Sequence, residues 1–573
     1  MGEFIEPQDQ KRYSVPVEAQ KLFLEQVLLN PQISKHLPEE LLHAGHKVRF
    51  TGSDLPRLPV NWRVAESSAA LHALVAVLVG LLVEKKYGVD APEVEINTDH
   101  AILYPLSLFL WTIDPEGERI EATSAGARLE KYIPNTDLHR RTATRHRAVT
   151  TNIYKCADGR WFQLHGSLNP DPVLDAIGLP RERDVDNVEQ AKALFQTKIA
   201  TFGSSEIREK MVAAGQPGDV CNSLTEYLAS EQGKANSHVG LFELKHHPSN
   251  RQKPVWWAAT NDTTSSRPLA GLKVIDMTRI IAAPAVTRGL AELGASVLRI
   301  TSPKLPDFHS LHPDLNWGKW NAHLDLHLSE DRETLKSLIL EADVVVSGYR
   351  PFVLKKYGFD RDGILELVSA RNHGIIFAQV DTYGWHGPSM DRPGYQPVSD
   401  ACVGISHGFG KAMGLADGEP VTALFPTSDY STGLAGVAAV LSALIQRAQV
   451  GGSYSIDLAL NYYNRWLAQS CGEYPDDVWD QLWASYGRFQ FRSDQAMEHT
   501  APIILKMMRD KGCLEERFFQ TIHSGALGVN IRCVAPVMTF PNGEIKLGFN
   551  VGARGNGLDQ ARWPMDLTSE VVT

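Results

Sequence analysis

The stretch PLAGLKVIDMTRIIAAPAVTRGLAELGASVLRI, residues 268–300, decides the fold of this chain. Residues 272–277 are a short apolar run rich in β-branched side chains, which is typical of a buried strand. Residues 283–294 follow with helical spacing and end at Gly294, a residue type common just beyond a helix. Residues 295–300 are a second apolar run. A strand, a helix and a strand at this spacing predict a parallel sheet with crossover helices.

The same alternation continues downstream. Residues 329–342 predict an amphipathic helix with acidic residues in its first turn, where the helix dipole favours negative charge. Apolar runs at 343–349 and 374–384 predict two further strands. We therefore expect a Rossmann-like α/β large domain, with a C-terminal extension, over residues 265–573. It has no G-x-G-x-x-G sequence, so the fold alone gives no reason to expect a dinucleotide site.

A smaller α+β domain is predicted upstream, at residues 151–260. Residues 152–167 contain two strand-like runs joined by Asp158-Gly159, a tight hairpin signal, and helical patterns follow. The polar, turn-rich residues 261–271 are expected to link this domain to the larger one.

The chain also resembles itself. Residues 66–83, ESSAALHALVAVLVGLLV, align without a gap on residues 429–446, DYSTGLAGVAAVLSALIQ, so that Glu66 falls on Asp429. A strand-like run follows each segment in a similar register. We therefore expect residues 1–150 to contain an N-terminal helical segment and a partial copy of the large domain.

Composition limits the possible partners. The chain has 573 residues, of which 43% are hydrophobic, and a formal charge of −10, which argues against nucleic acid as a partner. Its six cysteines are scattered without the spacing of metal ligands. This pattern predicts reduced thiols and no metal site.

No targeting or membrane segment is expected. The longest apolar run, residues 69–83, contains His72 and is too short to cross a bilayer comfortably. We interpret it as a buried helix. The polar N-terminal stretch MGEFIEPQDQKRYSV, residues 1–15, has no export signal, so a cytoplasmic location is expected.

Five segments resemble, in order, parts of the class III CoA-transferases, a family that also holds formyl-CoA transferases, carnitine CoA-transferases and α-methylacyl-CoA racemases. They are residues 268–300, NWGKWNAHLDL (316–326), ADVVVSGYRPFVLKKYGF (342–359), YGWHGPSMDRPGY (383–395) and SDYSTGLAGVAAVLSAL (428–444). The predicted small domain resembles the family's small domain. In the family the small domain is inserted into the large one, whereas here it comes first. The resemblance therefore implies a rearranged domain order with partial internal duplication.

The resemblance implies that Asp429 is the catalytic residue. Moving CoA between carboxylic acids needs a carboxylate nucleophile, which forms an acyl-aspartyl anhydride and then an aspartyl-CoA thioester. From the residues alone, Asp429 is equally well explained as a helix N-cap. The two roles are compatible, because a helix N-terminus favours an ionised carboxylate. We therefore expect activity to be flat near neutral pH and to fall only in acid.

Acyl-CoA is expected as a substrate, with no metal or redox cofactor. CoA carries phosphate groups, so basic residues should line its path. Arg350 matches a CoA-contacting arginine of the family, and Arg279 and Lys319 are further candidates. After the second strand, where the family usually has an acid followed by Arg or Lys, this chain has Thr301-Ser302. The basic residues 139–147, HRRTATRHR, are a candidate substitute.

Tyr395 separates transfer from racemisation. The racemases that the chain resembles have a histidine at this position, and a tyrosine, with an ordinary pKa of about 10, is a poor base near neutrality. Tyr395 is either a substrate-facing residue of the CoA site or an aromatic packing residue. An acyl-CoA racemase or isomerase remains an alternative, with His386 as the nearest histidine base in sequence, and so does a non-catalytic acyl-CoA-binding protein. The main expectation is a homodimeric transferase acting on an acyl-CoA and a small carboxylic acid.

Overall fold

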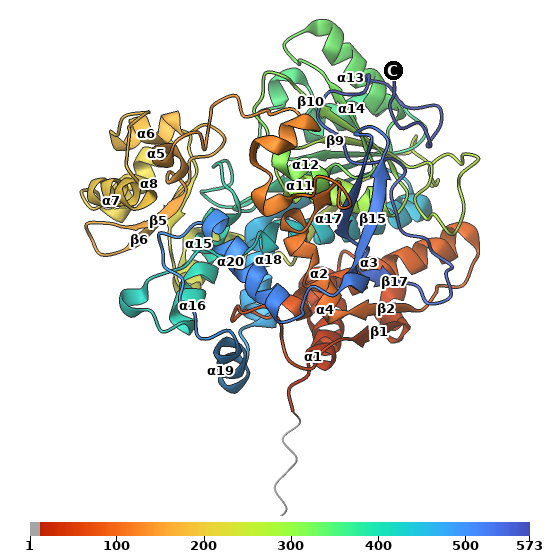
Figure 1. The fold of residues 1–573 in the computed structure, drawn as a ribbon. Helices are drawn as coiled ribbons and strands as arrows, with labels where there is room; N and C mark the ends of the chain where they lie inside the picture. Colours follow the sequence, from red (N-terminus) through yellow and green to blue (C-terminus); the bar gives the residue numbers. More distant parts are fainter. Residues whose placement is uncertain (1–11) are drawn as a thin grey trace, which may run out of the picture.

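The computed structural model describes residues 12–573 (Figure 1). Most of the N-terminal stretch on which the absence of an export signal rests lies outside these residues. The largest layer is a seven-stranded sheet in the order β11-β10-β9-β12-β13-β14-β8. Its strands are β8 (Phe242–His247), β9 (Lys273–Met277), β10 (Ser296–Thr301), β11 (Lys319–His323), β12 (Val344–Ser347), β13 (Ile376–Asp381) and β14 (Ser453–Ala459).

Strands β9 to β14 are all parallel, and β8 pairs antiparallel with β14 at the edge. Numbered along the chain from β9, the parallel strands lie in the order 3-2-1-4-5-6, which is the Rossmann order. The predicted α/β fold class is thus confirmed. The order reverses between β9 and β12, and this switch point positions the site described below.

Helices cover both faces of the sheet. Strand side chains alternate in direction, so each strand contributes to the core on both faces. On β9, Val274 belongs to the core with α11 (Ala282–Glu292) and α17 (Thr427–Val450), whereas Ile275 belongs to the core with α13 (Ser329–Glu341) and α14 (Arg361–Leu367). The strands are therefore apolar on both faces, as a parallel sheet requires.

Helix α3 (Val64–Tyr87) packs against α17. Both helices are long and apolar enough to span a membrane, but 100% and 78% of their most apolar windows are buried inside the protein. The apolar run at residues 69–83 is thus part of a core helix. Because α3 has few polar side chains on any face, it needs this complete burial.

The N-terminal region repeats the end of the large sheet. Its elements are β1 (Val48–Thr51), α3, β2 (Val94–Asn97) and α4 (Thr98–Ala101), and β17 (Met538–Thr539) joins them. Strand β2 is parallel to β1 and antiparallel to β17, just as β14 is parallel to β13 and antiparallel to β8. Helix α3 leads into β2 and α4 as α17 leads into β14 and α18 (Leu460–Trp466). The two regions therefore share the same order of elements and the same strand directions, and the partial duplication stays a prediction.

A small α+β unit lies at the left of Figure 1. Its antiparallel strands are β5 (Asn152–Lys155), β6 (Trp161–Leu164) and β7 (Gly218–Val220), and its helices are α5 (Arg145–Ala148), α6 (Asp171–Ile177), α7 (Val188–Ile199) and α8 (Ser204–Ala213). Gly159 turns the hairpin with φ of 80°. Strand β8 falls within residues 151–260, the predicted small domain, yet it pairs with β14 of the large sheet. That boundary therefore does not separate the two sheets.

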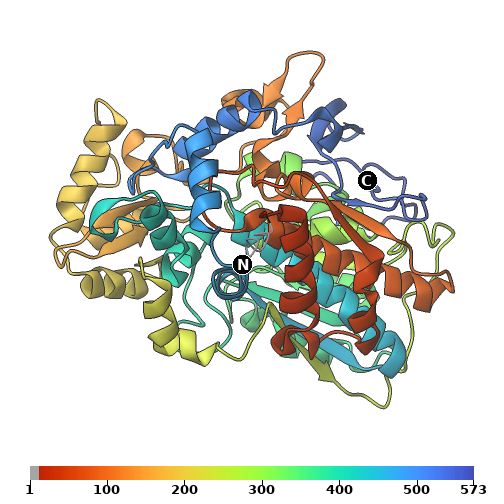
Figure 2. The same ribbon diagram turned by 90° about the horizontal axis from the view of Figure 1, so that it is seen from below.

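The C-terminal extension packs on the N-terminal region. Strands β15 (Phe519–Ser524) and β16 (Val529–Val534) form a sheet with the two-residue strands β3 (Thr112–Ile113) and β4 (Ile120–Glu121). Figure 2 shows these blue and orange segments side by side. The remaining α-helices are α1 (Val15–Lys21), α2 (Pro31–Ser34), α9 (Leu224–Ala229), α10 (Glu231–Ala235), α12 (His312–Leu315), α15 (Gln396–Val403), α16 (Ile405–Ala412), α19 (Asp476–Ser485) and α20 (Met497–Asp510).

Candidate active site

Two cavities meet at Asp429. Their volumes are about 440 Å³ and 410 Å³, and both are lined by Ser167, Leu168, Ile280, Ile281, Tyr395 and Asp429. We call the first the basic cavity, because Arg279, Arg350 and Arg392 line it. We call the second the apolar cavity, because its walls include Leu108, Phe109, Phe308, Leu311 and Met497. Asp429 is therefore accessible from both cavities at their junction.

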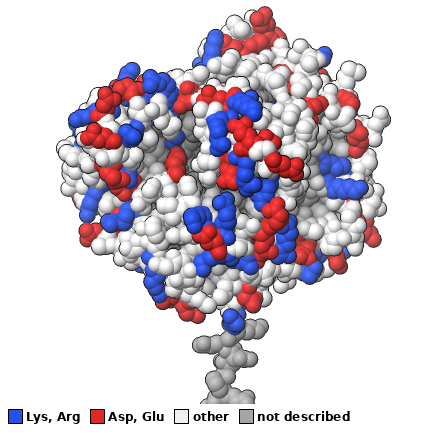
Figure 3. Space-filling model, in the orientation of Figure 1, with Lys and Arg blue, Asp and Glu red and all other residues white. Residues whose placement is uncertain are grey.

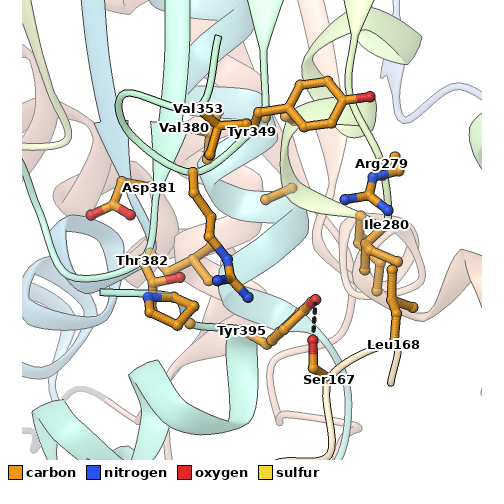
Figure 4. A pocket seen from close by; sticks show the side chains of 18 of the residues that line it. Ser167, Leu168, Arg279, Ile280, Tyr349, Val353, Val380, Asp381, Thr382 and Tyr395 are labelled. Carbon is orange, nitrogen blue, oxygen red and sulfur yellow. Dashed lines mark hydrogen bonds between the residues drawn. The ribbon is translucent and has the colours of Figure 1, made fainter. Parts of the chain in front are cut away.

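The basic cavity lies at the carboxyl ends of three parallel strands. The residues that follow β9, β12 and β13 line it, namely Arg279 to Ala283, Gly348 to Arg350, and Thr382. This is the switch point between β9 and β12, where open α/β sheets bind their ligands. Figure 4 shows Arg279 and Ile280 across the cavity from Asp381 and Thr382, with the hydrogen-bonded Tyr395 and Ser167 below.

Arg279 and Arg350 keep most of their donors free for a ligand. Arg279 donates from Nη1 to the carbonyl of Pro306 at 2.8 Å. Arg350 is exposed and donates from Nη1 to the carbonyl of Gly215 in the small unit at 3.0 Å. A guanidinium has five N–H donors, and each of these makes one hydrogen bond within the described chain. The structure brings both predicted CoA-binding arginines to one cavity with Asp429.

Ile280 is held in an unusual backbone conformation. Its φ is 70°, in the left-handed region, which is a genuine outlier for a β-branched residue. Such conformations cost about 1–3 kcal/mol and cluster at functional sites. Ile280 lies between Arg279 and the start of α11 and lines both cavities. The strain therefore falls at the junction beside Asp429.

Asp429 is not a helix cap. Helix α17 begins at Thr427 with Pro426 at the N-cap and no capping side chain, so Asp429 is its third residue. Asp429 is 7% exposed. Burial, and secondarily Asp400, raise the pKa of Asp429 well above its ordinary value. The expected capping role is therefore wrong, and burial acts against the ionised state that was expected for this carboxylate.

Asp400 was not singled out in the sequence and is the main charged neighbour of Asp429. It lies in α15 and accepts hydrogen bonds from Asn464 at 2.7 Å, from Ser428 at 3.3 Å, and from Gln396. Burial raises the pKa of Asp400 to about 7 despite these bonds. Asp400 and Asp429 are buried carboxyl groups that interact electrostatically. They resist ionising together, so their titrations are coupled. The sequence signal that could have identified Asp400 is an acidic residue in the mostly apolar segment VSDACV, residues 398–403.

Tyr395 and His165 form a stacked pair at the junction. Their rings are parallel within 5° at 4.4 Å between centroids, and the Tyr395 hydroxyl is 3.1 Å from Ser167 Oγ. His165 Nδ1 accepts the Ser167 backbone N–H at 3.0 Å, and burial lowers the pKa of His165 to about 3. At neutral pH this imidazole is uncharged, with its proton on Nε2, and it is a weak base. Tyr395 thus lines the site and also packs on an aromatic ring.

His386 lies away from both cavities. Its Nε2 is 2.8 Å from Glu243, and its ring is 4.8 Å from that of His238. His386 is therefore not placed to act as a base beside Asp429. His165 and His309 do line the apolar cavity with Asp429, but burial lowers the pKa of both and weakens them as bases. The racemase alternative is therefore disfavoured by the position of His386 and the lowered basicity of His165 and His309, as well as by Tyr395.

Lys319 is a core residue. Its side chain is 0% exposed, and Nζ donates at 2.9 Å both to Asp276 Oδ2 and to the carbonyl of Pro284. Burial lowers the pKa of Lys319 to about 8. This placement contradicts the prediction that Lys319 binds CoA. The lysine instead ties β11 to β9 and to the first turn of α11.

The basic segment 139–147 does not replace the cation missing at Thr301-Ser302. Arg147 is buried and bonded to Asp171 at 2.7 Å, whereas Arg141 lines the apolar cavity. The third arginine of the basic cavity, Arg392, is bonded to Asp219 and to Gly218 at 2.8 Å. The free cations of the basic cavity, among the described residues, are therefore Arg279 and Arg350.

Comparison with known proteins agrees with this geometry. Residues 269–481 match the family model described as CoA-transferase family III. The chain is 44% identical to "Acetyl-coenzyme A transferase nodX" of Hypoxylon pulicicidum, over 98% of this chain and 95% of that protein. It is 30% identical to an "Acyl-CoA transferase" of Gibberella moniliformis, over 94% and 93%.

Shorter relatives match a part of the chain. The human "Succinyl-CoA:glutarate CoA-transferase" is 29% identical over 35% of this chain and 47% of its own length. The similarity to the two fungal proteins, in contrast, runs through the N-terminal region, the small unit and the large sheet. This chain therefore belongs to CoA-transferase family III, the enzymes that move CoA between acyl-CoA thioesters and carboxylic acids.

Proposed function

We propose that this enzyme transfers CoA through a covalent relay on Asp429. A carboxylate oxygen of Asp429 attacks the thioester carbonyl of the donor, the C–S bond breaks, and CoA leaves as a thiolate. The thiolate attacks the aspartyl carbonyl of the resulting anhydride, which releases the donor acid as its carboxylate and leaves an aspartyl-CoA thioester. The acceptor carboxylate attacks this thioester, and the thiolate then attacks the acceptor acyl carbonyl. The new acyl-CoA departs and the Asp429 carboxylate is restored.

The observation that carries this proposal is the position of Asp429 at the junction of the two cavities. The relay needs CoA on one side of the carboxyl group and an acid on the other. The basic cavity offers Arg279 and Arg350 for the phosphates of CoA, since charge-assisted bonds to oxyanions are strong. The apolar cavity gives the acyl group a place outside the CoA path.

Burial tunes Asp429 for attack. A carboxylate with few solvent contacts is a better nucleophile than a hydrated one, but it must first lose its proton. The positive end of the α17 dipole lies beside it and favours the anion. Because burial raises the pKa of Asp429, the active form is populated only above that raised value. Activity should therefore decline with falling pH well above the range of an ordinary carboxyl group.

The test measures transfer and CoA binding in a variant of Asp429, and proton exchange in the parent enzyme. Asp429→Asn removes the nucleophile and preserves its shape, so transfer should be lost while calorimetry still detects CoA binding. Asp362→Asn, on the exposed face of α14, is the matched control and should behave like the parent. In D₂O the parent should not exchange the α-hydrogen of an acyl-CoA. Such exchange, or transfer by Asp429→Asn, would contradict the relay.

We also propose a homodimer in a cytoplasmic compartment. All six cysteines are free and buried, which is in keeping with a reducing environment. The homodimer follows from the resemblance to the family. Light scattering on the purified chain tests it, with a dimer mass expected and a monomer mass contradicting it.

A further inference from the structure

The apolar cavity is larger than a small acid needs. Its volume is about 410 Å³. At about 30 Å³ of liquid volume per water, such a space holds on the order of a dozen non-hydrogen atoms. The walls that Leu108, Phe109 and Phe308 supply would gain little from an acid of two or three carbons. The cavity therefore fits a carboxylic acid with a substantial apolar body.

Most of its distinctive walls come from outside the region shared with short relatives. Leu108 and Phe109 belong to the N-terminal region, and Met497 begins α20 of the C-terminal extension. None of these lies within residues 269–481, which match the family model. The additional parts of this chain thus shape the space on the acid side of Asp429.

Arg141 supplies the guanidinium of this cavity, whose described walls also carry the carboxyl groups of Asp137, Asp429 and Glu498. Asp137 accepts the backbone N–H of Arg141 at 2.7 Å. The Arg141 side chain is 10% exposed, and the nearest carboxylate to its guanidinium is Glu498 Oε1 at 3.6 Å, on a side chain that is 65% exposed. Its Nε is buried without a hydrogen-bond partner among the described residues. The guanidinium instead lies 4.9 Å from the ring centroid of Phe308. A buried guanidinium that is only loosely paired with an exposed carboxylate is incompletely satisfied, and a ligand anion would complete its pairing.

We propose that the apolar cavity selects an acid with a bulky apolar body and a second anionic group, which Arg141 binds. This inference rests on the proposed function, since it assumes that the reacting carboxyl group of the acid meets Asp429. The second anion lies at the other end of the acid and forms charge-assisted bonds with the guanidinium. Arg141 is then a specificity-determining residue that binds a group other than the reacting carboxyl group.

Three acids separate the two parts of the proposal. Suberate has a long apolar chain and two carboxylates, octanoate has the same chain length and one carboxylate, and succinate has two carboxylates and a short chain. With acetyl-CoA as donor, kcat/KM should be highest for suberate. The decrease in kcat/KM from suberate to octanoate measures the contribution of the second anion. The decrease from suberate to succinate measures the contribution of the apolar body. Each decrease should be about tenfold or more.

The variants then assign the anion preference to Arg141. Arg141→Gln should reduce kcat/KM for suberate about tenfold or more, mainly through KM, and leave octanoate nearly unchanged. Arg141→Lys should restore part of the preference. Glu498→Gln is the matched control on the same wall: it removes the competing carboxylate and should not weaken suberate. An equal loss for suberate and octanoate in Arg141→Gln would mean a structural role and overturn the inference.

Failure of this inference can be told from failure of the relay. Equal use of the three acids, or transfer to none of them while the enzyme still forms its aspartyl-CoA thioester, would overturn the acid specificity and leave the relay intact. Absence of that thioester together with absence of transfer would instead overturn the proposed function and the specificity that rests on it.

Discussion

Helices α17 and α3 begin alike and end in different roles. Each has 24 residues, carries a carboxylate at its third position, and leads into a strand and a short helix. Asp429 of α17 opens onto two cavities. Glu66 of α3 is 0% exposed, accepts hydrogen bonds from the hydroxyls of Tyr13 and Tyr474, and lies 3.7 Å from Arg63. The same position in the repeat is open in one copy and sealed in the other.

The difference follows from the sheet in front of each helix. Before α17 the chain builds strands β9 to β13, whose switch point forms the basic cavity. The N-terminal copy has β1, β2 and β17 alone, and these reproduce only the edge of the large sheet. In place of a switch point, the hydroxyls of Tyr13 and Tyr474 contact Glu66. A repeated helix therefore becomes a core element where its binding layer is missing.

The largest expected effect is on kcat, when the two carboxylates are replaced separately. Asp429→Asn should lower kcat on the order of 10³-fold or more, as removal of a covalent nucleophile does. Glu66→Gln should leave kcat close to the parent value, because Glu66 lines neither cavity. Steady-state transfer assays on both folded variants measure this. Loss of turnover in Glu66→Gln, with its thermal melting unchanged, would mean that the sealed copy takes part in catalysis.

The order of the two effects should reverse for stability: replacing Glu66 should destabilise the fold, whereas replacing Asp429 should not. Glu66→Ala leaves the hydroxyls of Tyr13 and Tyr474 without their acceptor, at a cost of about 1–3 kcal/mol for each unsatisfied buried group. Asp429→Asn instead removes a buried acid whose pKa is raised, so it should stabilise the fold at neutral pH. Thermal melts at one pH compare them. A lower Tm for Asp429→Asn than for Glu66→Ala would contradict this account.

The next prediction separates Arg350, which should affect acyl-CoA binding, from Lys319, which should affect stability. Arg350→Ala should raise KM for acyl-CoA about 10- to 100-fold, since a bond to a charged group contributes about 1.5–3 kcal/mol. KM for the acid should change little, and the effect should shrink at high salt. Lys319→Met should instead destabilise the fold by about 3–5 kcal/mol, because Asp276 loses its buried partner. Equal KM changes for both substrates in Arg350→Ala would make that arginine structural.

A smaller effect concerns pH. Asp400 raises the pKa of Asp429, so Asp400→Asn should move the acid limb of kcat/KM to lower pH, by about one unit. Both carboxyl groups have folded pKa values above their unfolded values. Their contribution to stability is thus full below about pH 4 and is lost as pH rises through the folded values, near 7 for Asp400. Activity profiles and melts from pH 4 to 8 check both signs, and an acid limb that does not move in Asp400→Asn would contradict the coupling.

Local sequence was enough for the large sheet and for part of the site. Apolar strands alternating with helices imply a parallel sheet. The resemblance to the family singles out Asp429, in the first turn of α17, and Arg279 and Arg350, in the loops after β9 and β12. Asp400 and His165 escaped notice because their roles depend on burial beside residues distant in the chain. The pairing of β3 with β16 is equally nonlocal, and β3 has two residues.

Two sequence interpretations failed for identifiable physical reasons. Asp429 resembles a helix cap, but Pro426 takes the N-cap position and moves the aspartate into the first turn. Lys319 resembles a surface cation, but it is the first residue of β11 and is fully buried, where Asp276 neutralises it. Charges of both signs are interspersed over the face drawn in Figure 3, which is hollowed between the small unit and the main body. Side-chain type alone therefore does not tell which charge faces a ligand.

Covalent trapping tests the central claim most directly. The enzyme is incubated with acetyl-CoA, and borohydride then cleaves any aspartyl-CoA thioester, which converts the aspartate to homoserine. Peptide mapping by mass spectrometry should find this change in the peptide that contains FPTSDYSTG, residues 425–433, and not in the peptide that contains WRVAESSAA, residues 62–70. Modification at Glu66, or an unmodified Asp429 in enzyme that is turning over, would contradict the account.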